Sequence, residues 1–359
     1  MAERGLRPAT DERSAIHSPS LYPRNMVRFT VLASGSKGNS TVVSGGRTRI
    51  LVDCGLSCRE LFRRMRLVGE EPETLDAVIV THEHSDHVNG VAVTARKLGI
   101  PVYFTESTHR AWMRWLTPRR QMTYAQWLEQ CRLQAAERQA EAQAEPDTAL
   151  AREADEICEA DAGLAGDGAS SPAAEPEPLD GGQPPSPKQD PAWLPAVEYF
   201  HAGQPFAVGD IAVSPFTIPH DAADPVGFVF QSEGVRMAFA TDLGYIPPNV
   251  RAQLQGVDLL LLESNHDLEM LRDGPYPWAV KQRVLSRVGH LSNEAAAGFL
   301  EDGYDGQAAY VILAHLSESN NLPELARVAA ERALSGRAQL LANRLLLAAQ
   351  HEPLSPIYF

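Results

Sequence analysis

The heptapeptide at 81–87 reads Thr-His-Glu-His-Ser-Asp-His and gathers three imidazoles and two carboxylates. Imidazole and carboxylate ligands without a thiolate suit Zn²⁺, Mn²⁺ or iron. A solvated polar turn is the simpler alternative, but such a turn does not need three histidines. The spacing therefore predicts a metal site in which His82 and His84 point to one ion, and Asp86 and His87 point to a second.

A site with two ions needs a carboxylate that bridges them and further imidazoles that complete each shell. The candidates are Asp242 for the bridge, with His220 and His315 as distal ligands. Each follows a predicted strand or lies in the adjoining loop. Two ions roughly 3.5–4 Å apart can hold a bridging hydroxide and clamp the attacking and leaving oxygens. Metal coordination brings the pKa of a bound water toward ~7, so a nucleophile exists at neutral pH.

The elements around these residues predict a common sheet edge. A short apolar strand over 76–80 precedes the heptapeptide, and a helix over 88–98, stopped by Gly99 and Pro101, follows it. Further strands are predicted over 211–216, 226–231, 236–241, 257–263 and 309–315, and helices over 278–288, 293–301 and 322–335. Strands that repeatedly end in ligand-type residues indicate one shared site in an α/β sheet.

The N-terminal part of the pattern predicts a strand over 27–32 and a hairpin of 41–44 with 48–52 across Gly45 and Gly46. Ser57 and Glu60 form a capping-box pattern for a helix through about Leu67, and a strand is predicted over 102–104. The glycine-containing loop at 34–40 has two interpretations. Its backbone N–H groups could face a phosphate, or it could be a tight turn between strands.

Composition changes sharply in the middle of the chain. Residues 1–25 are predicted to be a disordered leader, and residues 26–359 to be one catalytic domain. An acidic insertion rich in Ala, Glu and Pro interrupts that domain at 118–194. Residues 119–191 alone hold 15 acidic and 6 basic residues, so most of the net charge of −14 lies there. We interpret the insertion as a tolerated surface excursion, with a lid or the docking of an unknown protein partner as the alternative.

The cysteine content and the hydropathy of the sequence limit the cellular locations that it predicts. The four cysteines lack zinc-ribbon spacing, so we expect reduced thiols, Cys54 and Cys58 included. The N-terminus lacks an apolar signal-peptide segment, and no segment is long and apolar enough to span a membrane. We therefore expect no membrane association and a cytoplasmic location. The overall negative charge is not typical of a general nucleic-acid binder.

The His-x-His-x-Asp-His run at 82–87 resembles the signature of the metallo-β-lactamase superfamily. Seven further segments resemble its YycJ/WalJ-type branch, which is itself similar to tRNase Z-like nucleases: 33–40, 53–55, 219–223, 241–245, 263–267, 289–294 and 314–317. The resemblance implies an α/β (α+β) fold, the four-layer αβ/βα sandwich, in which two mixed sheets lie face to face, helices cover the outside and metals bind at one edge.

The resemblance also implies a role for each residue of the motifs. It implies a first ion held by His82, His84 and His220, and a second held by Asp86, His87 and His315. It implies that Asp242 bridges the two ions, which would be Zn²⁺ or Mn²⁺, and that Asp53 hydrogen-bonds the loop or a ligand imidazole. A strand-end cap is the alternative role of Asp53.

His290 distinguishes between kinds of substrate. It lies just before Ser292, a good N-cap for the predicted helix at 293–301, so its imidazole is placed beside a natural phosphate site. In tRNase Z-like nucleases a histidine in a comparable position acts on the scissile phosphate or leaving oxygen. We assign His290 as a phosphate contact and general acid. Glu263 is assigned as the carboxylate that orients it. The simpler alternative is that His290 is a surface histidine that caps the helix.

These assignments predict an enzyme, a dinuclear metal-dependent phosphodiesterase. The resemblance implies a nucleic-acid substrate, DNA rather than RNA, and exonuclease activity. The metal-bridging hydroxide would attack phosphorus. The alternative is a hydrolase of the same fold that acts on a small ester, thioester or lactam. His290 favours the phosphodiesterase, because a phosphate suits its surroundings better than an acyl group does.

Overall fold

A computed structural model of the 359-residue protein describes residues 26–116, 190–335 and 344–359. The predicted leader at 1–25 and nearly all of the predicted insertion lie outside the described residues. The elements named below belong to one compact unit of the chain. Among the described residues, no helix is long and apolar enough to cross a membrane.

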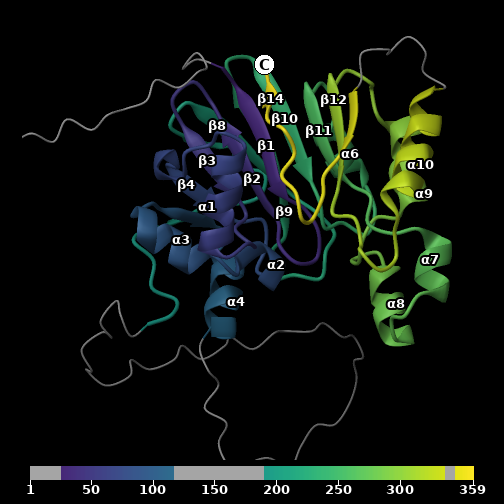
Figure 1. The fold of residues 1–359 in the computed structure, drawn as a ribbon, viewed down its shortest axis with the longest axis horizontal. Coiled ribbons are helices and arrows are strands. Elements are labelled where there is room, and N and C mark those ends of the chain that lie inside the picture. Colours follow the sequence, from purple (N-terminus) through teal and green to yellow (C-terminus); the bar gives the residue numbers. More distant parts are fainter. Residues whose placement is uncertain (1–25, 117–189, 336–343) are drawn as a thin grey trace, which may run out of the picture. The chain divides into compact units, whose positions relative to one another are not determined.

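The described strands form two seven-stranded mixed sheets (Figure 1). The first has the order β14-β1-β2-β3-β4-β5-β6, with bounds Ile357–Tyr358, Arg28–Ala33, Ser40–Ser44, Arg49–Val52, Ala77–Ile79, Val102–Phe104 and Val197–Tyr199. The second has the order β13-β12-β11-β10-β9-β8-β7, with bounds Arg344–Leu347, Tyr310–Ala314, Leu259–Glu263, Val235–Ala240, Val226–Ser232, Ile211–Thr217 and Phe206–Val208. In each sheet one half is antiparallel and the other half parallel.

The helices divide between the two sheets. Those that follow strands of the first sheet are α1 (Cys58–Leu67), η1 (Pro72–Thr74), α2 (Ser85–Val88), α3 (Val91–Leu98) and α4 (Glu106–Leu116). Those that follow strands of the second sheet are α6 (Pro248–Gln253), α7 (Leu268–Asp273), α8 (Trp278–Val284), α9 (Asn293–Gly298), η3 (Phe299–Gly303) and α10 (Pro323–Ser335). The predicted cap of α1 is present, since the Ser57 hydroxyl accepts a hydrogen bond from the Glu60 N–H.

Alternating side chains of the strands build three hydrophobic cores, which define four layers. Between the sheets, residues such as Phe29 and Ile50 of the first sheet pack with Phe228 and Phe239 of the second. The opposite face of the first sheet packs on α1, α3 and α4, and that of the second sheet packs on α6, α9 and α10. Because both faces of each sheet are covered, the central strands are apolar along their length.

Two boundaries differ from the sequence-based prediction. The helix predicted over 88–98 begins only at Val91, as α3, because the chain turns at Asn89 and Gly90; the short helix α2, which begins within the heptapeptide, precedes it. A Cβ at Gly90 would lie 2.0 Å from the Leu56 carbonyl oxygen, so the turn is packed too closely for any larger residue. At the other boundary, Leu194 is buried in the core under α1, α3 and α4, so packed structure resumes before residue 195.

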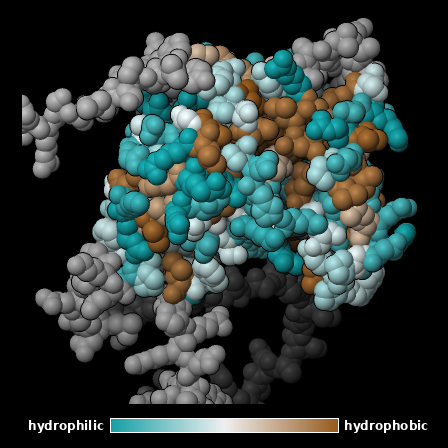
Figure 2. All heavy atoms as spheres, viewed as in Figure 1, coloured by the Kyte–Doolittle hydropathy of each residue, from teal (hydrophilic) through white to brown (hydrophobic). Residues whose placement is uncertain are grey.

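The surface over α1 and α3 is mainly hydrophilic in the view of Figure 2, whereas hydrophobic residues gather over β11 and β12. Several large apolar side chains are nevertheless exposed on helices of the second half. They include Trp278 and Val280 on α8 and Leu325 and Val328 on α10.

Candidate metal centre and its surroundings

Five of the predicted site residues lie at the carboxyl ends of strands. Asp53 follows β3, Asp242 follows β10, Glu263 ends β11 and His315 follows β12, while His82 follows β4 after two residues. Asp53, Asp242 and His315 adopt left-handed backbone, with φ of 58°, 60° and 57°. Residues other than glycine rarely adopt this conformation, which costs roughly 1–3 kcal/mol each and often occurs at functional sites. At each of these three residues the left-handed conformation turns the backbone away from the sheet.

His82, His84 and His220 come together as predicted. Nδ1 of His84 lies 3.1 Å from Nε2 of His82 and 3.2 Å from Nε2 of His220. The outer nitrogens of two of these rings have partners, because Nδ1 of His220 donates to the Gly289 carbonyl and Nδ1 of His82 lies 3.0 Å from the Thr81 hydroxyl. Three ring nitrogens thus face a common point with their ligand atoms within 4.8 Å of one another.

Asp86, His87 and His315 form the second predicted group, also within 4.8 Å. Oδ2 of Asp86 lies 3.4 Å from Nε2 of His87 and 3.5 Å from Nε2 of His315. The outer nitrogens of both rings donate to buried carboxylates: Nδ1 of His87 to Asp53 at 2.8 Å, and Nδ1 of His315 to Glu263 at 2.9 Å. Such partners fix the ring tautomer and aim the remaining nitrogen inward, as around metal ligands.

Asp242 lies between the two groups. Its Oδ2 is buried and lacks a hydrogen-bond partner, although Nε2 of His87 is 3.5 Å away, and its Oδ1 is 3.4 Å from Nδ1 of His315. Asp242 also forms a compact group with His82 and His87. A buried carboxylate oxygen without a hydrogen-bond donor, beside the imidazoles of His87 and His315, is a position that a cation would satisfy. The donor set therefore fits divalent metal binding.

Burial and mutual charge divide the histidines into two kinds. Burial, with His87 nearby, holds the pKa of His82 well below its usual range, and burial also lowers the pKa of His220. Burial opposes protonation of His87 and His315 as well. The carboxylate of Asp242 and neighbouring acids outweigh it, raising the pKa of His315 to about 10 and that of His87 well above its usual value. Without metal, protons on these two rings thus compensate the acidic groups.

Burial alone would raise the pKa of Asp86 and Asp242. The imidazoles of His87 and His315 outweigh that effect, so the pKa of each carboxyl is held far below its usual range. Both groups are therefore carboxylates at neutral pH and available as metal ligands.

Asp53 is completely buried and accepts hydrogen bonds from three groups. The N–H and hydroxyl of Thr81 donate to it, as does Nδ1 of His87. It thus contacts both the loop and a ring of the second group, the two contacts that the resemblance implied.

His290 and Glu263 are in direct contact, as we predicted. Nδ1 of His290 donates to Oε1 of Glu263 at 2.8 Å, and the His290 ring is 19% exposed. The backbone N–H groups of Leu243 and Leu291 donate to Oε2 of Glu263. Ser292 caps α9 through the Ala295 N–H, but α9 has only six residues before η3. Glu263 therefore holds His290 and His315 together at the edge of the metal centre.

Sequence reasoning missed the part played by Asn39. Its side-chain amide donates to Oδ2 of Asp86 at 3.2 Å, and its backbone N–H donates to the Asp86 carbonyl at 2.7 Å. The loop at 34–40, which we had considered for phosphate contact, thus holds the Asp86 loop in place. The type of residue and its place in a turn gave no signal of this contact, which depends on the approach of two loops 47 residues apart. His266 is buried and lies outside the metal groups.

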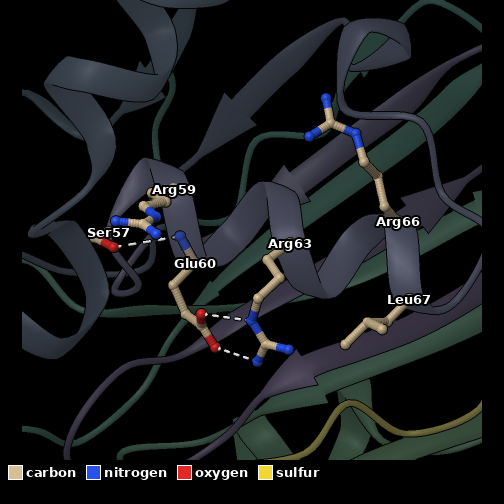
Figure 3. A pocket seen from close by; sticks show the side chains of 6 residues that line it. All are labelled: Ser57, Arg59, Glu60, Arg63, Arg66 and Leu67. Carbon is tan, nitrogen blue, oxygen red and sulfur yellow. Dashed lines mark hydrogen bonds and ion pairs between the residues drawn. The ribbon is translucent and has the colours of Figure 1, made fainter.

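A hollow of about 730 Å³ on the outer face of α1 offers no comparable chemistry. Figure 3 shows that its one carboxylate is already paired, because Glu60 accepts hydrogen bonds from Nε and Nη2 of Arg63. The other lining residues are Ser57, Arg59, Arg66 and Leu67.

The fold and this centre define a class of protein. Residues 33–290 match the metallo-beta-lactamase superfamily, and the chain belongs to that superfamily of hydrolases. It is 32% identical to exodeoxyribonuclease YycJ of Bacillus anthracis over 86% of this chain and 89% of that protein. It is 30% identical to exodeoxyribonuclease WalJ of Streptococcus pneumoniae over 84% of this chain and 86% of that protein. These findings confirm the family and branch predicted from the motifs.

A solved structure agrees on the fold. The metallo-beta-lactamase fold protein YhfI from Bacillus subtilis superposes with a TM-score of 0.55 at 14% identity, covering 92% of this chain and 99% of that one. The predicted arrangement of two mixed sheets flanked by helices is confirmed.

Proposed function

We propose that this protein is a metal-dependent exonuclease that hydrolyses phosphodiester bonds of DNA. The observation that carries the proposal is the His290–Glu263 pair beside two compact groups of ligand-type side chains. The similarity to the exodeoxyribonucleases YycJ and WalJ along most of both chains supports DNA as the substrate.

In this proposal, the chain holds two divalent ions. His82, His84 and His220 would bind one, Asp86, His87 and His315 the other, and Asp242 would serve both. The imidazole-rich first group suits Zn²⁺, while the carboxylate-containing second group also suits Mn²⁺. When bound, such ions supply an activated water and offset the charge that develops on a phosphate.

The chain's own residues supply orientation and a proton. Asp53 and Glu263 fix the rings of His87 and His315, so that Nε2 of each faces the centre. Because Nδ1 of His290 donates to Glu263, Nε2 is the ring atom left to contact a phosphate oxygen and to carry a proton to the leaving oxygen. Asp86 would act as the carboxylate ligand of the second group.

We also propose a cytoplasmic location. The free, buried thiols of Cys54 and Cys58 fit a reducing compartment. Burial raises the pKa of the Cys54 thiol to about 12, so it is unreactive at neutral pH.

The test is a nuclease assay on end-labelled single- and double-stranded DNA and RNA with Mn²⁺ or Zn²⁺. His84→Ala, which removes a ligand-type side chain of the first group, is the control. Stepwise release of nucleotides from DNA that is lost in the variant would support the proposal and give the polarity of attack. Failure to cleave any strand with either metal would contradict it, and esters, thioesters and lactams would then be the substrates to assay.

A further inference from the structure

The segment between Glu263 and His290 forms an arm with unusual surface chemistry. We define the arm as residues 268–288, which comprise α7, α8 and the turn that follows. In Figure 1 its two helices are drawn below α9 and α10. Five of the thirteen large apolar side chains exposed among the described residues belong to it: Leu268, Trp278, Val280, Leu285 and Val288.

Helix α8 lies at the surface along its whole length. None of its residues is buried, and Trp278 at its first turn is 66% exposed. Trp278 is not part of the core of the second half, to which α6, α9 and α10 contribute. Several exposed apolar side chains within one short segment are typical of an interaction site, whereas a single one would not be.

The charge of the arm is opposite to that of the chain. The arm contains four basic residues, Arg272, Lys281, Arg283 and Arg287, and two acidic ones, Glu269 and Asp273, so it carries +2 whereas the whole chain carries −14. Arg287 stacks over the Tyr245 ring at 4.4 Å, and Arg283 pairs with Asp221. Cations next to an exposed aromatic ring are the combination with which proteins bind single-stranded nucleic acid, through phosphates and base stacking.

The arm joins directly to the metal centre. The Val288 carbonyl accepts a hydrogen bond from the Asp221 N–H, and the next carbonyl, that of Gly289, accepts from Nδ1 of His220. Gly244 approaches the backbone of Arg287 so closely that a Cβ there would lie 2.4 Å from it. A strand held by the arm is therefore adjacent to the loops that carry His220 and Asp242.

We propose that the arm is a binding surface for single-stranded DNA, on which a base stacks against Trp278 and the backbone contacts Lys281. The inference rests on the proposed nuclease function and adds how a DNA strand is held, since an unpaired base has a free face that can stack on a side chain, whereas a base inside a duplex is stacked on both faces. A second copy of the chain suits the arm less well, because a two-fold interface would bring the same basic patch of both copies together.

The test measures binding of a fluorescein-labelled twelve-nucleotide oligothymidylate by anisotropy in EDTA, where hydrolysis is blocked. Trp278→Ala should weaken binding by about five- to a hundredfold, whereas Trp278→Phe should retain most of the affinity. Lys281→Gln should lower the slope of log affinity against log salt by about 0.7. Trp115→Ala is the matched control, because Trp115 is 56% exposed on α4, outside the arm, and its loss should change nothing.

A second measurement separates a damaged centre from a lost binding surface. With metal restored, hydrolysis of bis(p-nitrophenyl) phosphate, which contains no nucleobase, should be the same in wild type and Trp278→Ala, while KM for the oligonucleotide rises. Equal affinity of wild type and Trp278→Ala for the oligonucleotide, with nuclease activity intact, would overturn the inference alone. If the two proteins bound the oligonucleotide equally but wild type were a dimer and Trp278→Ala a monomer, the arm would be assigned to self-association instead. A wild-type protein that neither binds nor degrades DNA would overturn the proposed function and this inference together.

Discussion

At the scale of single residues, the hydrogen bonds to the outer histidine nitrogens organise the centre. Asp53 and Glu263 are both fully buried, and each serves one ring of the second group. Their burial would be unfavourable without partners, and the ring N–H groups together with backbone N–H donors provide them. The ligand-type side chains are thereby oriented before any metal arrives.

His290→Ala tests whether this residue is an acid or a ligand. We expect both metals to remain bound and turnover of DNA to fall by ~10²–10⁴-fold, the usual contribution of a general acid. Metal content by inductively coupled plasma mass spectrometry, measured beside kcat, checks this. A loss of one metal per chain would instead make His290 a ligand, a role that its place within 4.8 Å of Asp242, Glu263 and His315 would allow.

Metal loading should release protons. In the metal-free protein His87 and His315 have raised pKa values and are protonated at neutral pH, and an imidazole must lose that proton on its ligating nitrogen before it binds metal. Metal affinity should therefore fall as the pH is lowered. Calorimetric titration with Zn²⁺ at pH 7 in buffers of different ionisation enthalpy measures the protons released; a heat independent of the buffer would contradict the protonation assigned to these rings.

At the scale of elements, close backbone contacts between three loops fix the geometry. The Asp86 carbonyl accepts from the Asn39 N–H, the Asn39 carbonyl accepts from the Gly55 N–H, and the His87 carbonyl accepts from the Cys54 N–H. These bonds join the ends of β1, β3 and β4 into one rigid platform. Both glycines in it, Gly55 and Gly90, are approached too closely by neighbouring backbone to carry a side chain.

Gly55→Ala should disrupt that platform. Its Cβ would lie 1.7 Å from the Asp86 carbonyl oxygen, so the loop that carries Asp86 and His87 must move. We expect metal binding to be lost and the free energy of unfolding to fall by about 3 kcal/mol, as measured by urea denaturation.

Gly298→Ala is the matched control for that experiment. Nothing lies within 4 Å of its Cβ position, and it ends the helix α9. We expect full metal binding and a gain of up to about 1 kcal/mol. If the two alanine variants behaved alike, close packing at Gly55 would not be the cause of its effect.

The sequence was most informative where strands end in ligand-type residues. The strand over 76–80 and its polar continuation were enough to place His82, because a buried apolar strand followed by polar residues can end only at a sheet edge. The short strands β13 and β14 and the helices α6 and α7 were not predicted. Their few residues carry too little periodicity, and their place depends on pairing with distant elements, as β14 pairs with β1.

The contact of Asn39 with Asp86 was unpredictable for a related reason. An asparagine in a glycine-containing loop is typical of any turn, and only the packed structure brings it to the metal groups. In contrast, the His290–Glu263 pair could be predicted, since both residues adjoin elements with a clear pattern.

At the scale of the whole molecule, the compact unit contains every described site residue and three cores of its own. Its first sheet continues from β5 to β6 in parallel pairing, even though residues 105–196 separate the two strands in sequence. Among the described residues, the sheet therefore passes directly from β5 to β6.

Replacing residues 119–191 by a short Gly/Ser linker should leave a folded, metal-loaded protein. Long excursions between elements are tolerated because the entropy of loop closure depends only weakly on length. Thermal unfolding and metal content, compared with the full chain, provide the measurement. Loss of the cooperative transition would mean that the segment stabilises the compact unit; loss of DNA degradation alone would indicate a role in substrate binding.

The left-handed backbone of Asp242 and His315 has a consequence for protein engineering. Glycine adopts that conformation at lower cost, so glycine at these positions would relieve roughly 1–2 kcal/mol of backbone strain in the metal-free chain. The same substitution removes a ligand-type group, and with it the extra stability that bound metal gives to the native state. A thermostability screen carried out in chelator would therefore select inactive variants at both positions, whereas the same library screened with metal would rank them last.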